Sequence, residues 1–131
     1  MMLKIAKLLF FSLPLFALSN DGANRSFPFS IISVSVDSNE FYAPSTATLF
    51  YEENKLYGST GCNNYFGEFK QNENTITIFN VGSTRKLCDD NANEFERVFL
   101  SVFSDEFEIT NEGSDYFLKS HKALIKLKQN S

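Results

Sequence analysis

The feature that most constrains this chain is a series of short segments with strand periodicity, interrupted once by a helical period. In 32–36 apolar residues alternate with serines, as on a strand with one buried face. Polar clusters at 37–40, 52–55, 71–74 and 111–114 are expected to break the segments as turns. The pattern predicts strands over 32–36, 48–51, 56–58, 65–70, 75–79, 106–109, 116–119 and 123–127.

The helical segment spans 91–103, where apolar residues recur in steps of three and four and form one stripe. Asp89, Asp90 or Asn91 can cap its start, and Glu94 stands three residues after Asn91, in capping-box spacing. The stripe consists of Ala92, Phe95, Val98, Phe99, Val102 and Phe103, and the residues expected to face solvent are Asn93, Glu94, Glu96 and Arg97.

Strands on both sides of one helix place the chain in the α+β fold class. We expect a β-rich, curved antiparallel sheet or partly open barrel of about seven to eight strands with one helix. A single domain over 27–131 is long enough for one modest core, to which many phenylalanines contribute.

Residues 1–19 have the pattern of a secretory signal peptide. Lys4 and Lys7 precede a short apolar run, and small residues occupy Ala17 and Ser19. The run is shorter than the roughly 17–25 apolar residues that span a bilayer comfortably. The sequence therefore predicts an exported protein, periplasmic or secreted, with a flexible leader at 20–26 and no transmembrane helix after cleavage.

The charge balance disfavours two classes of partner. The chain has 12 basic and 16 acidic residues and a net charge of −4. Removal of the predicted signal peptide leaves 10 basic residues against 16 acidic ones, a net charge of −6. Nucleic acids and anionic lipids both require a cationic surface, so we expect neither as a partner.

The two cysteines, Cys62 and Cys88, both lie in the predicted mature part. In an oxidising compartment an isolated pair most simply forms one disulfide. Two free thiols remain the alternative, and a catalytic role is the least favoured reading because no histidine is near in sequence.

The sequence offers few candidates for a catalytic, metal-binding or phosphate-binding site. His121, the only histidine, falls at a predicted hairpin tip, and the Asp-Asp pair at 89–90 lacks the further oxygen ligands of a calcium loop. The glycines of 58–67 lead into a strand, whereas a phosphate loop leads into a helix. Arg85 can bind an anion, but an ion pair with an acidic neighbour at 89, 90 or 94 is favoured. We predict no catalytic residue, cofactor site or metal site.

Two motifs resemble those of the META domain, or HslJ-like, family. They are GSTGCNNYFGEF (58–69) and VGSTRKLC (81–88), the second followed by the predicted helix. The chain departs from the family pattern at 86–87, and it lacks the Trp common in the family's first strand. The matching residues are Gly58, Gly61, Cys62, Asn63, Tyr65, Gly67, Ser83, Thr84, Arg85 and Cys88, with Phe69 in the last aromatic place.

This resemblance implies a small β-rich bacterial envelope or secreted domain with no established enzymatic activity and no cofactor. Some members are linked to heat-shock response, novobiocin resistance or virulence. We therefore expect a non-enzymatic, monomeric envelope protein that binds a partner protein or small molecule in stress response or antibiotic tolerance. The alternative is an inhibitor of an envelope-directed lysozyme or protease that uses an exposed turn at 63–66 or 111–115; an enzyme is the third reading.

Overall fold

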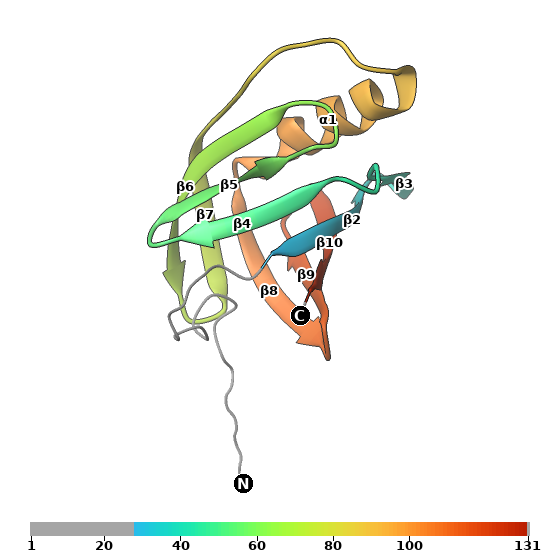
Figure 1. Cartoon of the computed structure of the whole chain (residues 1–131). Coiled ribbons are helices and arrows are strands. Elements are labelled where there is room, and N and C mark those ends of the chain that lie inside the picture. Colours follow the sequence, from blue (N-terminus) through green and yellow to red (C-terminus); the bar gives the residue numbers. More distant parts are fainter. Residues whose placement is uncertain (1–27, 131) are drawn as a thin grey trace, which may run out of the picture.

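The predicted strands pair into one antiparallel sheet that closes on itself (Figure 1). The computed structural model describes residues 28–130, so the predicted signal peptide and leader lie outside the described residues. Within that range eight strands form a barrel, which the pairing of β10 with β2 closes. The elements are β2 (Phe29–Val36), β3 (Asn39–Tyr42), β4 (Thr48–Glu52), β5 (Lys55–Ser59), β6 (Asn64–Asn72), β7 (Thr75–Ser83), α1 (Asp90–Phe103), β8 (Glu106–Glu112), β9 (Asp115–Lys119) and β10 (Ala123–Gln129).

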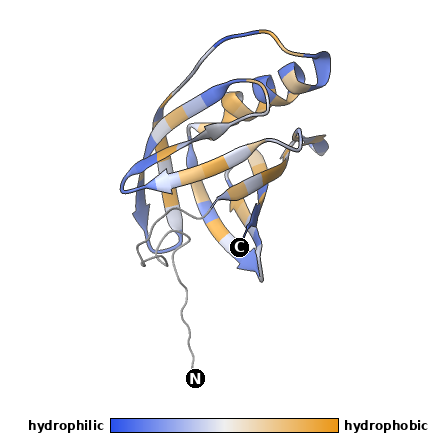
Figure 2. Ribbon diagram, in the orientation of Figure 1, coloured by the Kyte–Doolittle hydropathy of each residue, from blue (hydrophilic) through white to orange (hydrophobic). Residues whose placement is uncertain are grey.

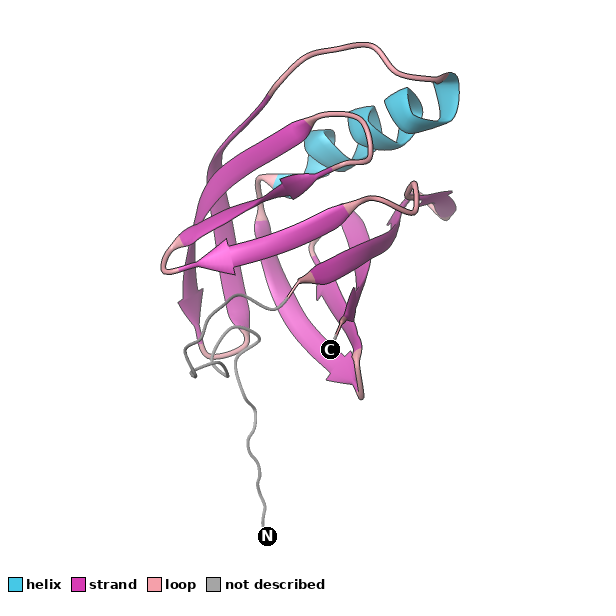
Figure 3. Ribbon diagram, viewed as in Figure 1, coloured by secondary structure: helices cyan, strands magenta, loops and turns pink. Residues whose placement is uncertain are grey.

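The predicted fold class is confirmed, and the barrel is fully closed. The predicted turns between β4 and β5, β6 and β7, and β8 and β9 are all present, although each strand is longer than expected (Figure 3). Hydropathy alternates along the strands, as expected for a barrel with one face of each strand in the core (Figure 2).

Strand β3 was missed, because the cluster 37–40 was expected only to break the first strand. The break is a two-residue turn in which Asp37 and Ser38 adopt φ values of 53° and 70°. Such a turn matches the twist of a hairpin, and the chain returns at once along β2, with Val36 opposite Asn39. β3 therefore extends the sheet beyond the closed barrel.

Helix α1 lies across one end of the barrel (Figure 1). Asp89 is its N-cap, and its carboxylate accepts a hydrogen bond of 2.8 Å from the Ala92 N–H. The capping box with Asn91 was a wrong prediction, since the N-cap is Asp89, two residues earlier. The six residues of the predicted apolar stripe are all buried.

The aromatic residues of α1 pack on Tyr65 of β6 in the core. The Phe99 and Phe103 rings both meet the Tyr65 ring edge-on with centroids 5.4 Å apart, and they stack on each other at 4.6 Å. The Tyr65 hydroxyl donates to the Thr48 carbonyl at 2.7 Å. Burial raises the pKa of Tyr65 well above its ordinary value, so this hydroxyl remains a donor.

We expect Phe99→Ala to lower the free energy of unfolding by about 3–5 kcal/mol, because it leaves a cavity where the helix meets the barrel. Urea unfolding would measure this loss. Leu124→Ala, at a partly exposed site on β10, is the control and should change stability by less than about 1 kcal/mol. Equal effects of the two substitutions would contradict the assigned core.

Candidate functional site

The first motif forms the corner between β5 and β6. Gly61 adopts a φ of +95°, and a Cβ there would lie 2.5 Å from the Pro44 ring. At Gly58 a Cβ would collide with the Thr48 carbonyl, the acceptor of the Tyr65 hydroxyl. Glycine is required at these two positions by backbone conformation and close approach, respectively.

Cys62 and Cys88 form a disulfide across 26 residues of chain. The predicted pairing is therefore confirmed, and the alternative of two free thiols is not observed. The bond joins the β5–β6 corner to the segment 84–88, which leads from β7 to α1.

The side-chain amide of Asn63 holds the same segment. Its Oδ1 accepts hydrogen bonds from the Lys86 N–H at 2.8 Å and the Thr84 hydroxyl at 3.0 Å. Its Nδ2 donates to the Lys86 carbonyl at 3.0 Å. Asn63 is only 2 % exposed, so the amide satisfies its polar atoms through protein groups.

Glu96 of α1 completes this network from the helix side. Its carboxylate accepts from the Thr60 hydroxyl at 2.6 Å, from the Asn63 N–H at 3.1 Å and from Asn63 Nδ2 at 2.9 Å. The prediction that Glu96 faces solvent was wrong. Helical periodicity places Glu96 beside the apolar stripe, but only the folded chain brings hydrogen-bond donors of Thr60 and Asn63 to its carboxylate. Charge-assisted bonds of this kind are stronger than neutral ones.

Asn93 holds the segment two residues further on. Its Oδ1 accepts from the Cys88 N–H at 3.0 Å, and its Nδ2 donates to the Cys88 carbonyl at 2.9 Å. Asn93 was also predicted to face solvent, and this was wrong for the same reason. The main chain is thus held at Lys86 and at Cys88, while Leu87 between them is 90 % exposed.

A groove of about 580 Å³ lies between the segment 83–87 and α1. Arg85, Lys86 and Arg97 contribute cations, and Leu87 and Leu100 contribute apolar surface. The favoured ion pair of Arg85 with an acidic neighbour is not formed within the described part of the chain. Arg97 does pair with Glu94, at 3.8 Å and with both side chains largely exposed, which makes the contact weak.

The structure brings the two predicted motifs together. Tyr65 faces the core, Gly67 packs closely on Val81, and Ser83 pairs with Tyr65 across the β6–β7 ladder. The Thr84 hydroxyl oxygen also accepts a hydrogen bond from the Asn64 N–H at 3.1 Å. Of the ten motif residues, Arg85 is the one whose side chain is exposed and unpaired within 28–130. The sequence did not predict that Glu96 and Asn93 hold the corner and the segment 84–88. The one available indication was that both are polar residues at the edge of the apolar stripe.

The remaining predicted features lie outside the network of the two motifs or on exposed turns. His121 is exposed at a bend, as expected. The turn at 63–66 is not a protruding loop, because Asn63 and Tyr65 are buried. The tip at 111–114 is exposed.

Within residues 28–130 no group of three His, Cys, Asp or Glu side chains could hold a metal ion. The helix in that range is too short and polar to cross a membrane.

These features define a small antiparallel β-barrel domain whose two motifs fix a helix across one end. The chain belongs to the META domain family, whose pattern matches residues 28–131. This is not a known family of enzymes.

Two solved structures share the fold. A protein from Burkholderia xenovorans, determined by NMR, has a TM-score of 0.67 and 16 % identity, over 80 % of this chain and 82 % of that one. A second protein determined by NMR has a TM-score of 0.57 and 20 % identity, over 78 % of this chain and 87 % of that one. None of the curated proteins matches this sequence.

We expect Asn63→Ala to destabilise the protein by about 2–4 kcal/mol, because it removes the Asn63 side-chain bonds and leaves Glu96 with fewer donors. Asn63→Asp keeps the size and the acceptor but places a second carboxylate against Glu96. It should therefore be at least as destabilising as the alanine variant in urea unfolding. Recovery of wild-type stability in Asn63→Asp would show that the amide donor is not needed.

We expect the double variant Cys62→Ser/Cys88→Ser to lose about 3.5 kcal/mol of stability, the chain-entropy value for this loop length. Asn63 and Asn93 should still hold the segment, so the circular dichroism spectrum should remain native-like. Thiol titration of the unreduced, denatured wild-type protein is the matching measurement, and two reactive thiols would contradict the disulfide.

Proposed function

We propose that this protein is a non-enzymatic, exported envelope protein that binds a partner protein or small molecule in stress response or antibiotic tolerance. The observation that carries the proposal is that the motif residues hold the segment 84–88 in place and present Arg85 and Leu87 outward. Membership of the META domain family supports the link to stress and antibiotic tolerance, which the motif resemblance implies.

The groove beside this segment has the composition of a binding site for an amphipathic anion. A carboxylate or phosphate would meet Arg85, which forms no ion pair with an acidic side chain of the described residues, while an apolar group would contact Leu87 and Leu100. Glu96 also lines the groove, but its carboxylate is bonded to Thr60 and Asn63. Because the segment is held at Lys86 and Cys88, binding would cost little conformational entropy. An acidic, apolar segment of an envelope protein and an anionic small molecule share this chemistry.

Export is supported by two observations. The sequence has the pattern of a signal peptide at 1–19, and the disulfide is of the kind that persists in oxidising compartments. The periplasm and the extracellular space both meet this condition, and the proposed binding is the same in either.

The alternative function, inhibition of an envelope-directed lysozyme or protease, would use the β8–β9 tip. Residues 111–114 are exposed there, and Gly113 adopts a φ of +62°. The tip is held by hydrogen bonds, such as that from the Gln129 N–H to the Ser114 carbonyl at 2.8 Å, but it has no disulfide like that of the segment 84–88, so we place the inhibitor second.

The proposal predicts that a photo-crosslinking amino acid at position 87 captures one discrete protein in the native envelope, or that novobiocin raises the melting temperature of the purified protein. The first result would identify a protein partner and the second a small anionic ligand. In either arm Arg85→Glu should weaken binding about tenfold or more, because it places a repulsive charge in the groove.

Lys119→Glu is the matched control, since it makes the same charge change on an exposed residue of β9, away from the groove. It should leave crosslinking or the thermal shift unchanged. Equal losses with Arg85→Glu and Lys119→Glu, or no signal in either arm, would contradict the proposed groove. Inhibition of lysozyme or a protease by the Arg85→Glu variant would favour the alternative.

A further inference from the structure

Strand β3 has an unpaired edge. Among the described strands, every barrel strand has neighbours on both sides, whereas β3 pairs with β2 alone. Unpaired edges present main-chain donors and acceptors, and proteins commonly keep such strands short or cover them. The strand has four residues, and nothing within residues 28–130 pairs with its outer side.

The ladder shows which main-chain groups lie on that edge. Val36 and Asn39 close the two-residue hairpin, and the Ala43 N–H donates to the Ile32 carbonyl at 2.9 Å, toward β2. Main-chain groups alternate in direction along a strand, so those of Glu40 and Tyr42 point away from β2. Two N–H donors and two carbonyl acceptors therefore lie on the free edge.

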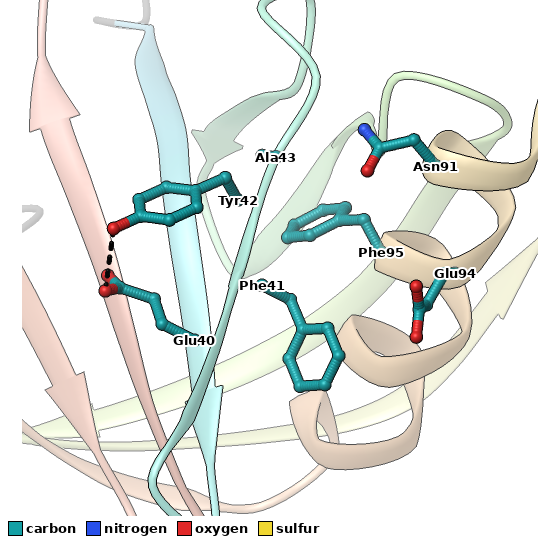
Figure 4. Close-up of a pocket in the computed structure, with 7 residues that line it drawn as sticks. All are labelled: Glu40, Phe41, Tyr42, Ala43, Asn91, Glu94 and Phe95. Carbon is teal, nitrogen blue, oxygen red and sulfur yellow. Dashed lines mark hydrogen bonds between the residues drawn. The ribbon is translucent and has the colours of Figure 1, made fainter.

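A groove of about 310 Å³ runs between this edge and the first two turns of α1. Four consecutive residues, 40–43, line it on the strand side. Because side chains alternate between faces, four consecutive residues can line one groove only along the edge of the strand. Figure 4 shows Phe41 and Phe95 between strand and helix, with Asn91 and Glu94 on the helix wall.

The groove is acidic. Glu94 supplies the carboxylate on its helix wall, and no lysine or arginine lines it (Figure 4). The Glu40 carboxylate lies on the other side of β3, where the Ser33 and Tyr42 hydroxyls donate to it at 2.7 and 3.0 Å and, with Lys126, lower its pKa. Glu94 has only its weak contact with Arg97. A basic ligand is the complement of this surface.

We propose that the β3 edge is a docking site for an extended peptide segment of a partner protein, with alternating basic and apolar residues, which adds to the sheet as one further strand. Its main chain would bond to Glu40 and Tyr42, an apolar side chain would contact Phe41, and a lysine or arginine would lie near Glu94. A second copy of this chain fits poorly, because its own β3 strand, Asn39–Tyr42, carries no lysine or arginine to meet Glu94. This site is separate from the groove at Arg85.

The probe is an acetylated six-residue peptide of alternating lysine and valine, titrated into ¹⁵N-labelled protein. We expect the amide resonances of Glu40 and Tyr42 to shift, and these amides to exchange more slowly with deuterium when the peptide is bound. Replacing lysine by glutamate in the peptide should abolish these changes. Failure of the lysine peptide to bind, or shifts confined to other residues, would overturn the proposal.

Tyr42→Pro removes one donor from the free edge without touching the bonds to β2, and proline is tolerated on edge strands. It should weaken peptide binding about tenfold. Tyr42→Val is the matched control, since it also removes the phenol but keeps the N–H, and it should retain most of the affinity. Equal losses in the two variants would show that the main chain is not bound, and would overturn strand addition.

Glu94→Lys should also weaken binding of the lysine peptide about tenfold, while Glu112→Lys on β8, with the same change of net charge, should not. Concentration-dependent dimerisation that Tyr42→Pro abolishes would assign the edge to a second copy and overturn the peptide proposal. None of these measurements involves Arg85 or Leu87, so their failure leaves the proposed function to its own test.

Discussion

The hydrogen bonds between Glu96 and the turn at 60–63 are the contacts on which the rest of this structure depends. They join a helix carboxylate to Thr60 and Asn63, and Asn63 in turn holds the main chain at Lys86. A charged group in such a position is stable only when donors surround it. The helix, the β5–β6 corner and the segment 84–88 are therefore fixed relative to one another.

This arrangement gives most of the motif residues a structural role. Glycines permit the corner and its close contacts, Tyr65 anchors it in the core, and the disulfide and two asparagine amides hold the segment 84–88. Among the side chains that the second motif presents to solvent are Arg85, Lys86 and Leu87. The main chain that carries these side chains is fixed at Lys86 and Cys88, which would lower the entropy cost of the proposed binding.

Helix α1 also separates two grooves of opposite character. The groove at 83–87 is lined by three cations and by Glu96, whereas the groove along β3 has the Glu94 carboxylate and no cation. The helix lines both, and its position is set by Glu96 and by the packing of Phe99 and Phe103 on Tyr65. Displacing the helix would alter both surfaces together, whereas substitutions at Arg85 or Tyr42 act on one surface each.

Local periodicity in the sequence determined the barrel strands and the helix, because alternation and the three-four step depend only on which residues the core must bury. The presence of two cysteines in a chain expected to be exported predicted the Cys62–Cys88 disulfide. Only the tertiary structure decided that 39–42 forms a strand with a free edge, that Glu96 and Asn93 turn inward, and that Arg85 remains unpaired. Glu96 turns inward through contacts with Thr60 and Asn63, which are distant in sequence, and β3 keeps a free edge because no described strand pairs with its outer side. A linear pattern carries no record of which groups will meet.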